Sequence, residues 1–110
     1  MTIGEIKKTS DYRKIKKSML DQLKRRDCDT PYYRSLVQDY MSMYATKEMA
    51  VQDVEERGNI IHYIGSNGGK MTKKNESSEL IIKLNAQMLK LLDTLGIKPQ
   101  SEVASIDERL

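Results

Sequence analysis

The chain has 110 residues, of which 38% are hydrophobic and 32% charged, and this length allows one compact domain and excludes a multidomain enzyme. Its net charge is +3 and its single cysteine, Cys28, cannot form an internal disulfide, so we expect a reducing compartment. We also expect a soluble protein without membrane contact, because no stretch approaches the roughly 20 apolar residues that span a bilayer and no signal peptide is recognisable.

The N-terminal region is predicted to hold one short basic helix, over residues 10–26. Tyr12, Ile15 and Met19 recur at spacings of three and four, which is the period of an amphipathic helix. Residues 1–30 contain nine Lys or Arg against five acids, so this region could hold phosphate. The alternative is that these charges form only a solvated face.

A long helix is predicted over 31–57, because Thr30 can cap it, Pro31 suits the first helical position and Gly58 can end it. Residues 59–74 follow with a β-rich run and a Gly-rich turn, which indicates a β-hairpin or an extended loop. This segment has three lysines and no acid, and so forms a second basic zone.

A second long helix is predicted over 76–95, with Asn75 as its cap and Gly96 as its end. Ile82 and Leu89 lie off its main apolar stripe, so this helix needs more than one neighbour. We expect an antiparallel helical hairpin whose outer face meets another subunit. The alternative is a monomeric three-helix bundle in which the N-terminal helix covers that face.

Candidate oligomerisation residues come from both long helices: Tyr33, Val37, Tyr40, Tyr44, Ile82, Leu84, Met88, Leu89 and Leu92. The fold class is therefore mainly α, with a short basic N-terminal helix and a long helical hairpin that carries a small β-hairpin insertion. We divide the chain into a basic segment (1–29), an oligomerisation core (30–96, with the β-hairpin at 59–74) and a flexible tail (97–110).

No catalytic constellation is recognisable, so we expect neither an enzyme nor a cofactor or metal. The Gly-rich run before Lys70 fails as a phosphate-binding loop, because Ile64 stands where the first glycine is needed and Met71 where Ser or Thr is needed. His62 is the only histidine and has no second histidine or cysteine pair to build a metal site with it.

Residues 30–101 resemble one family of small terminase subunits from tailed bacteriophages. The resemblance lies in the order of a Tyr-rich helix start, an acidic helix end at Gly58, the β-rich run with its Gly-rich turn, Asn75 opening the next helix, and a closing Leu-Gly-Ile-x-Pro-x-Ser stretch. The residues that carry its two ends are Pro31, Tyr32, Tyr33, Tyr40, Met43 and Tyr44, and then Leu95, Gly96, Ile97, Lys98, Pro99, Gln100 and Ser101.

The resemblance implies a non-catalytic role in packaging viral DNA in the cytoplasm of the infected bacterial host. Small terminase subunits assemble as homo-oligomeric rings, recognise the packaging site on concatemeric double-stranded phage DNA, and recruit or regulate the large subunit, which carries the ATPase and nuclease. Helices 31–57 and 76–95 would then build the ring, and the tail after Gly96 would face the large subunit.

One feature departs from many members of that family, which carry an N-terminal helix-turn-helix. Residues 1–29 have room for only one good helix, and such a motif needs two. Our hypothesis is that basic side chains contact DNA phosphates, and that ring symmetry multiplies a weak contact. The candidates are Lys7, Lys8, Arg13, Lys14, Lys17, Lys24, Arg25 and Arg26, with Lys70, Lys73 and Lys74 as a second group.

Two other functions remain open from the sequence. The chain could be a helical oligomeric adaptor that binds only protein, or a small DNA-binding transcriptional regulator.

Overall fold

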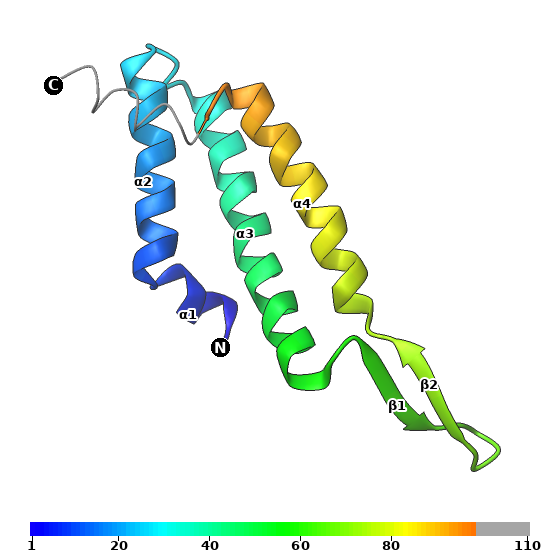
Figure 1. Cartoon of the computed structure of the whole chain (residues 1–110). Coiled ribbons are helices and arrows are strands. Elements are labelled where there is room, and N and C mark those ends of the chain that lie inside the picture. Colours follow the sequence, from blue (N-terminus) through cyan, green and yellow to red (C-terminus); the bar gives the residue numbers. More distant parts are fainter. Residues whose placement is uncertain (99–110) are drawn as a thin grey trace, which may run out of the picture.

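The computed structural model describes residues 1–98 and is mainly helical, with one two-stranded antiparallel sheet (Figure 1). Its elements in chain order are α1 (Ile3–Lys7), α2 (Ser10–Arg25), α3 (Pro31–Arg57), β1 (Ile60–Ile64), β2 (Lys70–Lys74) and α4 (Glu76–Leu95). Helices α3 and α4 lie side by side as an antiparallel hairpin, and α2 packs against α3. The β-hairpin projects beyond the end of the helical hairpin, which makes the molecule long, at 65 × 30 × 23 Å.

The ends of the long helices lie where their capping residues predict. The Thr30 side chain accepts a hydrogen bond from the Tyr33 amide, and Pro31 occupies the first turn of α3. The Asn75 side chain accepts a hydrogen bond from the Ser77 amide at the start of α4. Gly96 follows α4 in the left-handed conformation, at φ 67°. The predicted helical hairpin with its β-hairpin insertion is thus confirmed.

The prediction of a single helix in residues 1–29 is wrong, because α1 precedes α2. Thr2 caps α1 by accepting from the Glu5 amide, while the Glu5 carboxylate accepts from the Thr2 amide. This reciprocal pair is a capping box, which stabilises a helix of only five residues. Ile6 is buried on the inner side of α1 and joins the main core.

The core lies along α3, which packs against both α2 and α4. Three residues of α3 fill its centre, namely Val37, Met41 and Ala45. Val37 was a candidate oligomerisation residue in the sequence, and Met41 and Ala45 were not singled out; a helix with neighbours on two sides buries a wide face. The rest of the core cluster is Ile6, Tyr12, Met19, Leu23, Leu95 and Ile97.

The outer face of α4 is left open. The side chains of Ile82 and Leu89 are 70% and 66% exposed, so the N-terminal helices do not cover them as the three-helix-bundle alternative required. Ile97, the first residue of the predicted tail, is buried in the core, and residues 99–110 lie outside the described part. None of the helices in residues 1–98 is long and apolar enough to cross a membrane.

Candidate nucleic-acid interface

The first candidate site is the outward face of α2. This helix contains six Lys or Arg and two Asp, while its apolar side chains face α3. Five of the basic side chains are exposed and are here called the α2 basic face: Arg13, Lys14, Lys17, Lys24 and Arg25. At 1.5 Å per residue they extend over about 18 Å of helix. Such an arrangement offers a row of cations to a polyanion.

One carboxylate lies within this face. The Lys17 amine donates to Asp21 Oδ2 at 2.8 Å, and this hydrogen bond lowers the pKa of Asp21 and raises that of Lys17. Their side chains are 78% and 45% exposed, so water screens the pair and it contributes little to stability. Lys17 can therefore exchange Asp21 for another anion at small cost.

The other N-terminal candidates are placed differently. Lys7 and Lys8 are exposed at the end of α1, outside the α2 basic face. Arg26 points to the core side of α2, where its Nη2 donates to the Leu95 carbonyl oxygen at 2.5 Å and its Nε donates to the Gln22 carbonyl oxygen at 3.4 Å. Arg26 therefore links α2 to the end of α4, and the structure does not bring it together with the basic face.

The hairpin lysines form a second group at the far end of the molecule (Figure 1). All three are exposed, and the strand register divides them between the two faces of the ribbon. Lys70 and Lys74 lie on one face with Thr72 between them. Lys73 lies on the other face, with its amine 5.7 Å from the centre of the Tyr63 ring.

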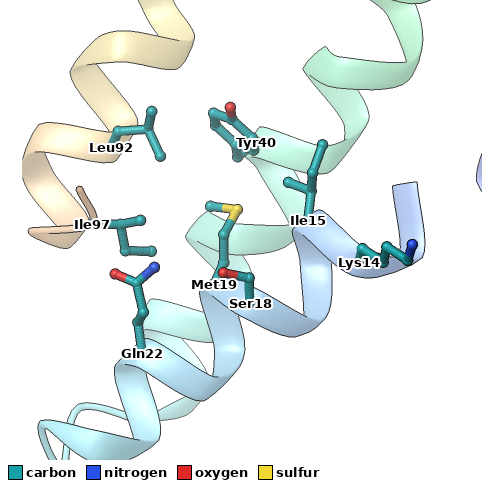
Figure 2. A pocket seen from close by; sticks show the side chains of 8 residues that line it. All are labelled: Lys14, Ile15, Ser18, Met19, Gln22, Tyr40, Leu92 and Ile97. Atoms are coloured by element: carbon teal, nitrogen blue, oxygen red, sulfur yellow. The ribbon is translucent and has the colours of Figure 1, made fainter. Parts of the chain in front are cut away.

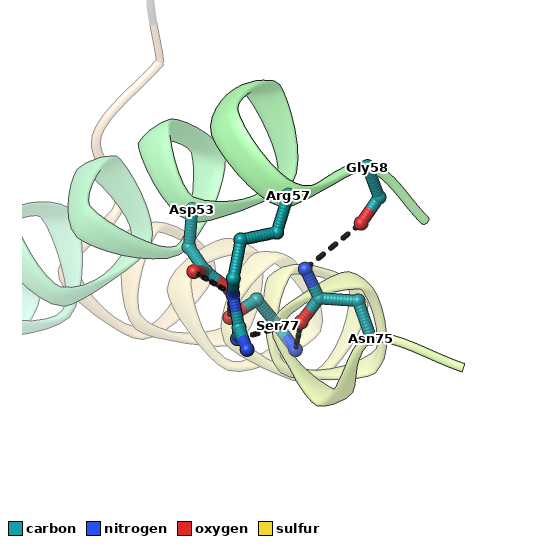
Figure 3. Close-up of polar contacts among 5 residues, drawn as sticks. All are labelled: Asp53, Arg57, Gly58, Asn75 and Ser77. Carbon is teal, nitrogen blue, oxygen red and sulfur yellow. Dashed lines mark hydrogen bonds and ion pairs between the residues drawn. The ribbon is translucent and has the colours of Figure 1, made fainter. Parts of the chain in front are cut away.

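A polar cluster fixes the base of the β-hairpin, and the sequence interpretation missed it (Figure 3). The carboxylate of Asp53 accepts two hydrogen bonds from the Arg57 guanidinium, at 2.5 and 2.7 Å, and one from the Ser77 hydroxyl at 2.6 Å. Buried Asn75 donates to the Gly58 carbonyl oxygen at 2.9 Å. The cluster thus ties the end of α3 to the start of α4 across the hairpin.

These contacts hold the pKa of Asp53 well below its usual range, first through the Arg57 guanidinium and then through the Ser77 hydroxyl. In the sequence, Asp53 lies close to Glu55 and Glu56 near the end of the predicted helix 31–57, and such a group of acids is typical of solvated charge. Its role depends on Ser77, 24 residues later in the chain, and no local pattern could have indicated that pairing.

An apolar groove of about 390 Å³ lies where α2, α3 and the end of α4 meet (Figure 2). Its lining residues are Lys14, Ile15, Ser18, Met19, Gln22, Tyr40, Leu92 and Ile97. Burial raises the pKa of the Tyr40 phenol. The lining holds one lysine and no carboxylate, so it resembles a packing seam more than a site for acid and base chemistry.

The predicted oligomerisation residues differ in their availability. Val37 and Met88 are buried within the chain itself. Ile82 and Leu89 are exposed on the open face of α4. The other five are partly buried: Tyr33, Tyr40, Tyr44, Leu84 and Leu92.

Metal-binding geometry is not found in residues 1–98, where no three His, Cys, Asp or Glu side chains are grouped to hold an ion.

Comparison with known proteins gives one family. A family model described as phage terminase, small subunit, matches residues 13–106, and this span includes α2 from Arg13 onward, the whole helical hairpin and the β-hairpin. Neither the curated proteins nor the solved structures contain a match to the chain.

Proposed function

We propose a DNA-binding role for this chain, which belongs to the phage terminase small-subunit family and acts in phage DNA packaging. In this proposal it recognises the packaging site on concatemeric double-stranded DNA in the cytoplasm of the infected host. It then recruits or regulates the large subunit, and it does no catalysis itself.

The α2 basic face carries this proposal. Its five cations are exposed, so phosphates can reach them without any opening of the core. Each neutralised phosphate releases condensed counterions, and this release drives binding without any base contact. A single α2 would bind weakly, because it offers only a few such contacts.

Assembly into a homo-oligomeric ring would multiply that contact, and we propose this assembly as well. The support is the open face of α4, where Ile82 and Leu89 expose apolar surface that a second copy could cover. Several α2 basic faces held in one ring raise the effective concentration of every contact after the first.

The test is a filter-binding salt titration on duplex DNA that contains the packaging region. The variant replaces Arg13, Lys14 and Lys17 by alanine. A matched control replaces three exposed lysines elsewhere, Lys83, Lys90 and Lys98, so that both variants lose the same charge.

For each subunit that touches DNA, the α2 variant should reduce the slope of log K against log salt by up to about 3, and the control should leave it unchanged. An unchanged slope in the α2 variant would refute the assignment to α2. Wild-type protein that binds no DNA would instead favour the protein-binding adaptor.

We also propose that residues 97–110 contact the large subunit; of these, 99–110 lie outside the described residues. A chain that ends at Lys98 should keep its DNA affinity and fail to co-purify with the large subunit. Retention of the large subunit by the shortened chain would place that contact elsewhere.

A further inference from the structure

We infer that the β1–β2 hairpin is a second DNA contact, a β-ribbon that enters a groove of the duplex. This inference rests on the proposed function, because it takes DNA as the ligand of the chain, but it concerns a different site from the α2 basic face.

The hairpin exposes more apolar surface than a small two-stranded sheet can explain. Ile60, Tyr63 and Ile64 are 54%, 41% and 67% exposed, and Met71 is 45% exposed. In the part of the chain that the structure describes, β1 and β2 pair only with each other. Isolated two-stranded hairpins are marginally stable, so this surface calls for a partner.

The charge of the hairpin indicates what kind of partner it has. Residues 59–74 contain three lysines and no acid, while α3 and α4 on either side carry both signs. A polyanion therefore fits this element better than a basic or a neutral protein surface does. Double-stranded DNA is the polyanion that the proposed function already supplies.

The strand register gives one face of the ribbon the features of a groove reader. Lys70 pairs with Ile64 and Lys74 pairs with Ile60, so the two lysines stand at opposite ends of that face, about 13 Å apart along β2. Thr72 and its partner His62 lie between them. This arrangement places cations where phosphates would flank a groove, and polar side chains where base edges would lie.

The dimensions also fit. The major groove of B-form DNA is about 12 Å wide and admits a two-stranded β-ribbon. Each strand has five residues and so spans about 17 Å, enough to follow the groove over several base pairs.

The base of the hairpin is held firmly enough to present that face. The backbone N–H of Asn75 donates to the backbone carbonyl oxygen of Asn59 at 2.8 Å, and the Ser78 hydroxyl donates to Asn59 Oδ1 at 2.7 Å. Together with the contact of Asp53 and Ser77 that Figure 3 draws, these bonds fix the base of the ribbon to the ends of α3 and α4. A ribbon anchored in this way loses less freedom when it binds.

The experiment compares two double variants of the full chain by salt titration on duplex DNA. One replaces Lys70 and Lys74 by alanine, and the matched control replaces Lys83 and Lys90 by alanine. A third variant with arginine at positions 70 and 74 keeps the charge. Thermal unfolding and light scattering are measured on each protein.

The alanine variant of the hairpin should reduce the salt slope by about 2 for each subunit that touches DNA, while the control and the arginine variant keep the wild-type slope.

A wild-type slope in the alanine variant, with the α2 variant still impaired, overturns this inference and leaves the proposed function standing. The alanine variant could instead form a smaller oligomer, and its salt slope could fall only in proportion to the mass of that oligomer. That result would overturn the inference and show that the hairpin contacts a second copy of the chain. If the alanine variant keeps the wild-type salt slope but no longer binds the large subunit, the inference is overturned, and the hairpin contacts an acidic surface of that protein. Failure of wild-type protein to bind DNA removes the proposed function itself.

Discussion

Arg26 and Leu95 are 69 residues apart in the chain, and a hydrogen bond between them joins α2 to α4. The Arg26 Nη2 donates to the Leu95 carbonyl oxygen at 2.5 Å, at the C-terminal end of α4. The last carbonyl groups of a helix have no partner within it and carry partial negative charge, so a guanidinium is well suited to that position. This bond holds the end of α2 to the helical hairpin beside the apolar groove.

Replacing Arg26 by alanine should lower the free energy of unfolding by about 1–2 kcal/mol, because the bond to Leu95 is lost and its carbonyl is left with water. Arg25 is exposed in the α2 basic face, and its replacement by alanine should change that free energy by less than about 0.5 kcal/mol. Urea titrations of both variants make the comparison. Equal stability of the two would mean that the bond to Leu95 does not hold the helices together.

A methyl group at position 96 should be poorly tolerated. Gly96 has φ 67°, and a Cβ there would lie 2.6 Å from the Arg26 Nη1. Gly96→Ala should lower the free energy of unfolding by at least about 1 kcal/mol through the left-handed conformation alone. It should also weaken the hydrogen bond from Arg26 to the Leu95 carbonyl oxygen. Gly4→Ala is the control, since Gly4 lies in α1 with its nearest neighbour 3.8 Å away, and should stabilise by about 0.5 kcal/mol. Circular dichroism during urea titration measures both, and a neutral Gly96→Ala would contradict the geometry.

The Asp53 cluster should make the fold sensitive to acid. The pKa of Asp53 is lowered in the folded chain, by Arg57 first and then by Ser77, so its contribution is complete above the unfolded value of about 3.9 and is lost as the pH falls below it. The thermal midpoint should therefore drop between about pH 5 and pH 2. Asp53→Asn should lower the midpoint at pH 7 and flatten its dependence on pH.

Asp21→Asn is the matched control for this experiment. Asp21 also accepts from a basic residue four positions away, and its pKa is also lowered, but it has no link to a second helix. Its replacement should change the midpoint less than Asp53→Asn does. An Asp53→Asn variant with the acid profile of the wild type would show that the cluster contributes nothing to stability.

The helix boundaries could be predicted because their signals are local. Thr30 caps α3 by accepting a hydrogen bond from the amide of Tyr33. Gly96 ends α4 because glycine adopts the left-handed conformation readily. Helix α1 was missed although its capping box is just as local, because a segment of five residues shows no clear apolar period. Short elements of this kind have to be identified by their caps.

The tertiary roles could not be predicted. Ala45 is fully buried at the centre of α3, and no hydrophobicity pattern marks an alanine as core. Arg26 was a candidate DNA contact because it lies in the basic N-terminal region. Only the position of Leu95 in the fold shows that its guanidinium donates to a carbonyl oxygen of the same chain. The sequence predicted the candidate interface as two basic zones. It could not predict that Lys70 and Lys74 share one face of the hairpin, because this depends on the register of β1 and β2.

The open face of α4 leads to the last prediction. If Ile82 and Leu89 contact a second copy, replacing both by serine should reduce the mass of the assembly measured by light scattering at physiological salt. The subunit itself should keep its helical content, because both side chains are exposed and no core contact is lost. Met88→Ala tests the opposite case, since Met88 is buried and its truncation should cost about 2–5 kcal/mol of stability. A wild-type protein that runs as a monomer would exclude the ring, and a double variant with unchanged mass would move the interface to another face.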